Sequence, residues 1–286
     1  MTFSLFGRLS PKGICSTQPF PRGALAILLV LSHAVFAQTS RPEKFITDVS
    51  HVISGAGHVL TSPTRWQGKD WAIFGSVLAG TFALSYLDEP FDDLMQRNRS
   101  GFADRLNDIG IEYGEPRTAV LLTGGVYLSG LIIDNDWLRE TGVIASASLL
   151  SSGIIQSTTK AAAGRARPHV GLGHDVFDPF RGEENYYSFF SGHTMVAMII
   201  SHTFAKRINH PVAKVAFYSL GTVAGLARAY NRDHWLTDVV LGNALAITSV
   251  NSVSRWLAAK KDGKEMGGLQ WQLTPRGRGV NLSMAW

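Results

Sequence analysis

Residues 191–204, Ser-Gly-His-Thr-Met-Val-Ala-Met-Ile-Ile-Ser-His-Thr-Phe, indicate the fold class of this chain. The run 192–204 is strongly apolar, and its length and composition favour a helix over a strand. Ser191 is a natural helix cap, because its hydroxyl can accept a hydrogen bond from a free N–H group of the first turn. The stretch therefore predicts an apolar helix that begins directly after Ser191.

Five other segments are also rich in Ala, Leu, Ile, Val and Gly and are predicted to be helices. Gly, Pro or charged residues bound several of them, and short links between the later segments favour antiparallel neighbours. The sequence therefore predicts an all-α fold, an antiparallel helical bundle of about six apolar helices at 71–86, 119–133, 143–155, 192–204, 212–227 and 235–250.

The two ends of the chain differ from this bundle. Three basic residues precede an apolar run at 24–36, and Ala37 ends a Val-Phe-Ala pattern that a signal peptidase can cut, although an uncleaved membrane anchor stays open. At the other end, apolar and polar residues alternate around a Pro-Arg-Gly-Arg-Gly turn at 275–279, which predicts a small β-hairpin packed on the bundle. The expected parts are a signal peptide at 1–37, an exported N-terminal segment at 38–68, a helical catalytic domain at 69–258 and a hairpin tail at 259–286.

Composition limits the classes of partner. The chain has 286 residues, 45% hydrophobic and 17% charged, which suits one folded core rather than a disordered chain. Its net charge of +5 comes from scattered basic residues without interleaved aromatics, so we expect no nucleic-acid partner. A basic balance also suits phosphorylated lipids or other anionic substrates.

Two clusters of phosphate-binding side chains follow or begin apolar segments. Lys160 and Arg167 are seven residues apart before Pro168, so a helix continuing through Ala163 would place both cations on one face. Ser191, Gly192 and His193 open another helix, whose free N–H groups favour an anion. Each pattern alone also fits an ordinary role, either solvated cations at a helix end or a simple cap.

The third cluster joins two apolar segments. Arg228 ends one of them, His234 begins the next, and Asp238 follows four residues later. On a helix this spacing makes His234 and Asp238 neighbours, so the carboxylate could hold one ring nitrogen and leave the other free to attack. A surface ion pair is the alternative for this cluster, and phosphate chemistry is predicted because all three clusters occur together.

The order and spacing of the three clusters resemble the PAP2 superfamily of phosphatidic acid phosphatases and vanadium haloperoxidases. Its motifs are Lys, six residues, Arg-Pro; then Pro-Ser-Gly-His; then Ser-Arg, five residues, His, three residues, Asp. The resemblance covers roughly residues 70–255. This chain departs from the pattern at Phe190, which replaces Pro, and at Ala227, which replaces a Ser hydroxyl that would contact phosphate.

The resemblance implies a phosphatase acting on phosphomonoesters or diphosphates, most naturally of lipids, through a phosphohistidine. His234 would be the nucleophile, Asp238 would orient it, and His193 would protonate the leaving oxygen. The implied phosphate ligands are Lys160, Arg167, Ser191, Gly192 and Arg228. No cofactor or metal is implied. A vanadate-dependent haloperoxidase and a non-catalytic anion-binding protein are the alternatives, and the substrate and the oligomeric state stay open.

The signal pattern, the basic loops and the apolar segments together predict an exported enzyme, membrane-associated or integral, with its site facing the periplasm. If all six segments crossed a bilayer, the three motifs would meet on one side. The other side would hold seven basic residues, namely Lys206, Arg207, Lys214, Arg255, Lys260, Lys261 and Lys264. However, a cleaved signal followed by three crossings would place Lys160 inside, and the segments are shorter than the ~20 residues of a typical span. The acidic stretch from Asp88 to Asp93 is expected to be a solvated helix end.

Overall fold

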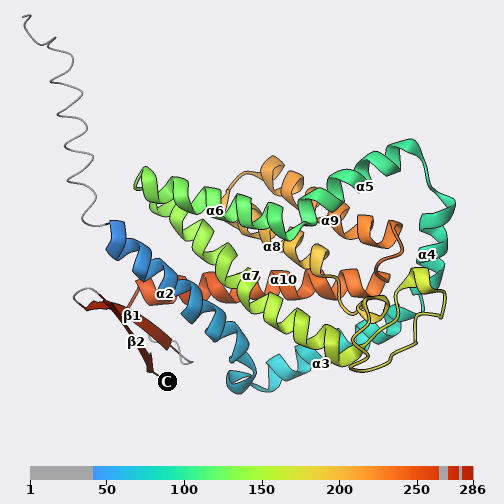
Figure 1. Ribbon diagram of the computed structural model, residues 1–286, viewed down its shortest axis with the longest axis horizontal. Helices are drawn as coiled ribbons and strands as arrows, with labels where there is room; N and C mark the ends of the chain where they lie inside the picture. Colours follow the sequence, from blue (N-terminus) through green and yellow to red (C-terminus); the bar gives the residue numbers. More distant parts are fainter. Residues whose placement is uncertain (1–40, 264–269, 277–278, 286) are drawn as a thin grey trace, which may run out of the picture. The chain divides into compact units, whose positions relative to one another are not determined.

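The computed structural model describes residues 41–263, 270–276 and 279–285. This part of the chain contains nine α-helices and one pair of strands (Figure 1). The helices are α2 Arg41–Leu60, α3 Gly68–Ser85, α4 Asp88–Arg97, α5 Gly101–Gly114, α6 Pro116–Ile132, α7 Asp136–Ala163, α8 Gly192–Arg207, α9 Pro211–Tyr230 and α10 Leu236–Lys261. The predicted signal peptide at 1–37 lies outside the described residues.

All six predicted apolar segments are helical, which confirms the all-α class. They correspond to α3, α6, α7, α8, α9 and α10. Local capping explains several starts: Ser191 accepts a hydrogen bond from the backbone of Thr194 at the start of α8, and Pro occupies the first turn of α6 and α9. The helices α4 and α5 were not predicted, because charged residues interrupt their apolar pattern.

The helix α2 packs on the rest of the helical core. Its Asp48 accepts hydrogen bonds from Arg139 of α7, at 2.9 and 3.0 Å, and from the Tyr127 hydroxyl of α6 at 3.0 Å. The ring of His58 lies 6.3 Å from that of Trp256 in α10. The segment 38–68 therefore contributes a helix to the same core as the predicted catalytic domain.

The centre of the core lies along α8. Eleven residues of this helix are buried, among them Ile199 and Ile200. On neighbouring helices, Ser152 of α7 donates a hydrogen bond to Ser249 of α10 at 2.8 Å, and both are buried. Small residues let these helices approach closely, so their ends are held in fixed relative positions.

The helices α7, α8 and α10 have two chemically different ends. At one end, Arg207 of α8 donates to the Trp137 carbonyl of α7 at 2.9 Å, and Lys261 of α10 pairs with Glu140 of α7 at 2.5 Å. All three sequence motifs lie at the other end, where α7 and α9 finish and α8 and α10 begin. The fold thus places the three motifs at the opposite end from the ion pairs of Arg207 and Lys261 with Glu140.

The C-terminal part of the described chain is a pair of antiparallel strands. Strand β1, Gln270–Arg276, pairs with β2, Gly279–Ala285, and Leu273 lies opposite Leu282. The expected packing of this pair on the bundle stays a prediction.

One described helix, α10, is long and apolar enough to cross a bilayer by itself. The pair α3 and α4 meets the same criterion only as a single span bent by 53°. Because 44% of the apolar window in α10 is buried within the protein, this helix also serves as a core helix.

Candidate active site

The first motif ends α7 instead of continuing it. Lys160 lies in the last turn, the helix finishes at Ala163, and Gly164 has a left-handed backbone with φ of 58°. A Cβ atom at Gly164 would lie 1.8 Å from the Asp178 carbonyl oxygen, so only glycine fits. The prediction that Lys160 and Arg167 share a helix face is therefore wrong: Arg167 lies beyond a sharp turn.

Three cations of the predicted site nevertheless come together. Burial lowers the pKa of Lys160 to about 8, with a further contribution from the positive charge of Arg167, and Arg228 acts in the same direction. Burial also lowers the pKa of Arg228, and Arg167 again contributes. Cations that depress one another's pKa lie close together, and such a group favours an anion between them.

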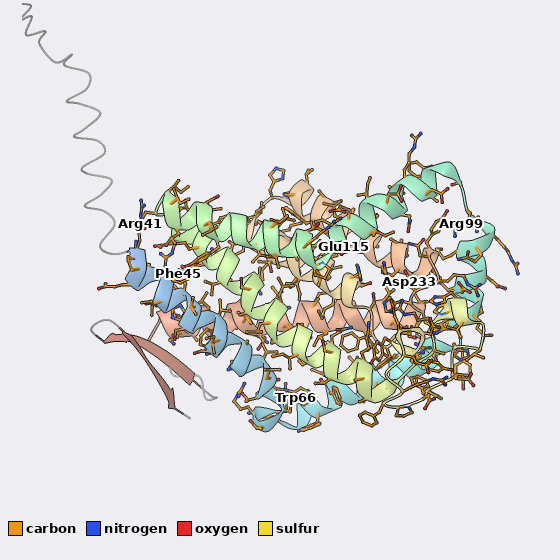
Figure 2. The ribbon with its side chains drawn as sticks, viewed as in Figure 1. Arg41, Phe45, Trp66, Arg99, Glu115 and Asp233 are labelled. Atoms are coloured by element: carbon orange, nitrogen blue, oxygen red, sulfur yellow. The ribbon has the colours of Figure 1, made fainter. Side chains whose placement is uncertain are left out.

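Carboxylates satisfy these arginines only in part. Asp233, in the loop between α9 and α10 (Figure 2), lies 2.8 Å from Nη2 of Arg228 and 3.6 Å from Nη1 of Arg167. The Nε groups of Arg167 and Arg228 are buried without a hydrogen-bond partner among the described residues. Buried donors without partners are costly, so both Nε groups are available to an anionic ligand.

The second motif forms the start of α8. Ser191 is fully buried and caps this helix, accepting from the Thr194 hydroxyl at 2.8 Å and from its backbone N–H at 3.4 Å. The backbone N–H of Ser191 donates to the Asp238 carbonyl at 3.1 Å, which joins the starts of α8 and α10. A side chain at Gly192 would lie 3.2 Å from Gln156, so the first turn of α8 is closely packed there.

His193 follows in the first turn of α8 and pairs with a carboxylate that the motif did not predict. Its Nε2 lies 3.2 Å from Oε1 of Glu115, the residue that precedes α6. Burial lowers the pKa of His193, and Arg228 adds to this effect, whereas Glu115 opposes it. The Glu-Pro sequence at 115–116 marked a helix start, but nothing in the sequence linked it to His193.

The His234 ring is buried with a defined orientation. Its Nδ1 lies 2.7 Å from the Ser188 carbonyl oxygen. Because a carbonyl only accepts hydrogen bonds, Nδ1 carries the hydrogen, and in the neutral ring Nε2 is the unprotonated nitrogen. Burial lowers the pKa of His234 to about 4, so the ring is neutral at pH 7. A neutral imidazole with a free Nε2 is a competent nucleophile.

Asp238 does not bond to the ring directly, contrary to the sequence prediction. Its Oδ2 lies 3.9 Å from Nδ1 of His234, beyond hydrogen-bond distance. The carboxylate accepts instead from the Ser188 hydroxyl at 2.5 Å, from the Trp235 backbone N–H at 3.0 Å and from Arg165 at 2.9 Å. Ser188 thus connects the two groups, since its hydroxyl bonds Asp238 and its carbonyl bonds His234.

Behind this pair lies a buried charge network that the sequence reading missed. Arg165 donates to Asp238 and, at 2.7 Å, to Asp88, whose carboxylate also accepts from the backbone and hydroxyl of Thr237 at 2.9 and 2.7 Å. The expectation of a solvated acidic stretch is wrong for Asp88, which is fully buried, and for Asp92, which is also buried. The other two acidic residues of that stretch, Glu89 and Asp93, are exposed.

The two departures from the family motifs are both packed in the interior. The carbonyl of Phe190 accepts from Gln156 at 3.2 Å, and its side chain belongs to the core. Ala227 is buried against α5, where a Cβ atom at Gly110 would lie 2.9 Å from that of Ala227. Within the described residues, no three His, Cys, Asp or Glu side chains are placed to hold a metal ion.

Comparison with known proteins agrees with the motifs. Residues 141–262 match the family model described as PAP2 superfamily. The transmembrane PAP2 type phosphatidylglycerolphosphate phosphatase from Bacillus subtilis is similar in fold, with a TM-score of 0.53, 17% identity, and coverage of 68% of this chain and 98% of that chain. LpxE of Aquifex aeolicus gives a TM-score of 0.48, 18% identity, and coverage of 59% and 95%. No curated protein sequence matches this chain.

The family match includes all three motifs, from Lys160 to Asp238, and their residues meet at one end of the helices. Over residues 141–262, the chain is similar to the PAP2 superfamily.

Proposed function

We propose that the protein is a PAP2-type lipid phosphatase that hydrolyses phosphomonoesters or diphosphates through a phosphohistidine intermediate. One observation carries the proposal: a buried, neutral His234, oriented through Nδ1, lies close enough to Lys160 and Arg228 for both cations to lower its pKa. A neutral nucleophile beside fixed cations suits attack on phosphorus.

In the first step, Nε2 of His234 attacks phosphorus and the bond to the leaving oxygen breaks. His193 gives its proton to that oxygen, so an alcohol leaves from a lipid monophosphate. In the second step, His193 accepts a proton from water, and the resulting hydroxide attacks the phosphohistidine. Inorganic phosphate is released, and both histidines return to their starting states.

The three equatorial phosphoryl oxygens would be held by Lys160, Arg167 and Arg228, together with Ser191 and the N–H of Gly192. The unpartnered Nε groups of the two arginines support this assignment, as does the position of Gly192 at a helix N-terminus. Positioning and charge stabilisation account for most of the catalysis in phosphoryl transfer.

Asp238 would stabilise the positive charge that develops on the His234 ring. At 3.9 Å in a buried site its charge acts strongly on the ring, and it positions the ring through Ser188 instead of by direct contact. Asp238 is therefore assigned both an electrostatic and a positioning role.

A lipid substrate and attachment to a membrane are supported by the surface of α3. No residue of this helix is buried, and Ile73 and Phe82 are 63% and 69% exposed. Trp66 lies just before this helix (Figure 2). Its ring is 4.8 Å from that of Trp71, and Phe74 packs on both. Large exposed apolar surfaces mark membrane or protein contacts, and tryptophans favour the membrane interface.

We also propose that residues 1–37 are removed on export and that the site faces the periplasm. The basic residues at the far ends of α8 and α10 support this orientation, since positive residues favour the cytoplasmic side. Amino-terminal sequencing of the mature protein should begin at Gln38, and a start at Met1 would contradict the cleavage.

The catalytic proposal is tested by rapid-quench labelling with a ³²P-labelled lipid monophosphate. Acid-labile label should appear on the wild-type chain and be absent from His234→Ala, whereas His210→Ala, a change at an exposed histidine, should label normally. Vanadate should inhibit turnover, and chelators should not. Full activity of His234→Ala would refute the mechanism.

A further inference from the structure

We propose that Glu115 is a specificity determinant that favours monophosphates, whose leaving group is an uncharged alcohol, over diphosphates, whose leaving group is a phosphate. The inference deepens the proposed function and rests on it, because it takes His193 as the group that protonates the leaving oxygen. Glu115 therefore lies on the side of the site from which the leaving group departs.

The backbone holds Glu115 against His193. Glu115 is the residue between α5 and α6 (Figure 2), and Pro116 begins α6 directly after it. The preceding residue, Gly114, is buried so close to α8 that an added Cβ atom would lie 3.0 Å from the His193 carbonyl oxygen. This close approach places Oε1 of Glu115 at 3.2 Å from Nε2 of His193.

Both side chains are accessible to a substrate. The side chain of Glu115 is 32% exposed and that of His193 is 26% exposed, in contrast to the 2% of His234. The nucleophile is thus enclosed, whereas the acid and its carboxylate partner lie at the solvent-accessible side of the site. That side is where the organic part of a substrate has to extend.

Glu115 has a different cation partner from the neighbouring carboxylates. Asp233 lies against Arg167 and Arg228, and Glu184 lies 3.7 Å from Arg167, so permanent cations compensate both. Glu115 contacts His193, which is charged only when protonated, and the guanidinium of Arg228 is close enough for its charge to interact with Glu115. The leaving group therefore meets a carboxylate that His193 neutralises only transiently.

Two effects of this carboxylate act in the same direction. It favours the protonated form of His193, which an alcohol leaving group needs because alkoxides are strongly basic. It also repels a phosphate leaving group, which carries its own negative charge and needs protonation less. Monoesters gain from the first effect, and diphosphates lose from the second.

The test compares kcat/KM for dioctanoyl phosphatidic acid and farnesyl diphosphate in the same mixed micelles. Glu115→Gln should shift the ratio of the two constants at least about tenfold toward the diphosphate, the scale of one partly screened charge contact. Glu115→Asp keeps the charge and should keep most of the wild-type preference. The matched control is Glu112→Gln, three residues earlier, where the carboxylate is exposed and pairs with Arg117 and not with His193.

A ratio in Glu115→Gln within threefold of the wild type would overturn the inference, as would an equal shift in Glu112→Gln. If the wild type hydrolyses the substrates and Glu115→Gln has the same ratio of kcat/KM values as the wild type, the proposed function stands and only the specificity role of Glu115 is removed. Failure of the wild type to hydrolyse either substrate would overturn the proposed function and, with it, this inference.

Discussion

Replacing Arg165 by methionine should strongly destabilise the fold. The Arg165 side chain is 3% exposed and lies between two fully buried carboxylates, 2.7 Å from Asp88 and 2.9 Å from Asp238. It also donates twice to the His174 carbonyl, at 2.7 and 2.9 Å. Methionine would keep much of the packing volume and remove every one of these hydrogen bonds.

The size of the effect follows from the burial of both partners. Removing one member of a buried ion pair leaves an uncompensated charge and costs about 3–5 kcal/mol. For a protein of 150–250 residues, each kcal/mol shifts Tm by roughly 2–4 °C, so the expected loss is about 6–20 °C.

Thermal unfolding followed by circular dichroism measures this loss, with both proteins in one detergent at one scan rate. Arg181→Met is the matched control, because Arg181 is exposed and pairs with the exposed Asp178 and Glu183. Adding Asp88→Asn to Arg165→Met should cost less than the sum of the two single changes, since the network is shared. A Tm of Arg165→Met within 2 °C of the wild type, which corresponds to about 1 kcal/mol or less, would refute the reasoning. An equal loss of Tm in Arg181→Met would refute it too.

Three further outcomes follow from the site. Burial lowers the pKa of His234 to about 4 from 6.5, so on acidification the unfolded chain is protonated at this residue before the folded chain. The stability of the fold should therefore fall as pH drops from 6.5 to about 4. His234→Gln should flatten the slope of Tm against pH in this range, and an unchanged slope would contradict the assignment. Ala227→Ser should change kcat/KM by ~10-fold or less, because the position faces Gly110 of α5. A wild-type enzyme without activity that becomes active in Ala227→Ser would contradict this. Gly164→Ala should cost about 2 kcal/mol or more in an unfolding titration, from its left-handed backbone and the clash with Asp178; a wild-type midpoint would be inconsistent with that turn.

The apolar helices could be predicted from sequence because each has a long, nearly uninterrupted apolar run. The spacing of His234 and Asp238 correctly predicted neighbouring side chains, 3.9 Å apart, but not the missing direct hydrogen bond. The reason is that α10 begins at Leu236, so His234 precedes the helix and the rule for residues four apart on a helix does not apply. The position of Arg167 was also predicted wrongly because of a helix boundary. The alanines before Gly164 favoured a helix that continues to Arg167, whereas the glycine ends α7.

The buried network lay beyond any local pattern. Asp88 and Arg165 are 77 residues apart, and Arg165 and Asp238 are 73 apart. An acidic residue two positions before a proline and a basic residue after a glycine both fit exposed positions equally well. Only the packing of α4 beside the start of α10 reveals that these charges neutralise one another in the interior.

The helix ends around the site reduce the repulsion among its cations when no phosphate is bound. Lys160 and Arg228 lie in the last turns of α7 and α9, where backbone carbonyls make a partial negative charge, and the phosphate would lie where α8 begins, at a partial positive charge. The peptide dipoles therefore offset part of the repulsion among the cations. Because this compensation comes from the backbone, the cations need fewer carboxylate partners, and fewer carboxylates compete with phosphate for them.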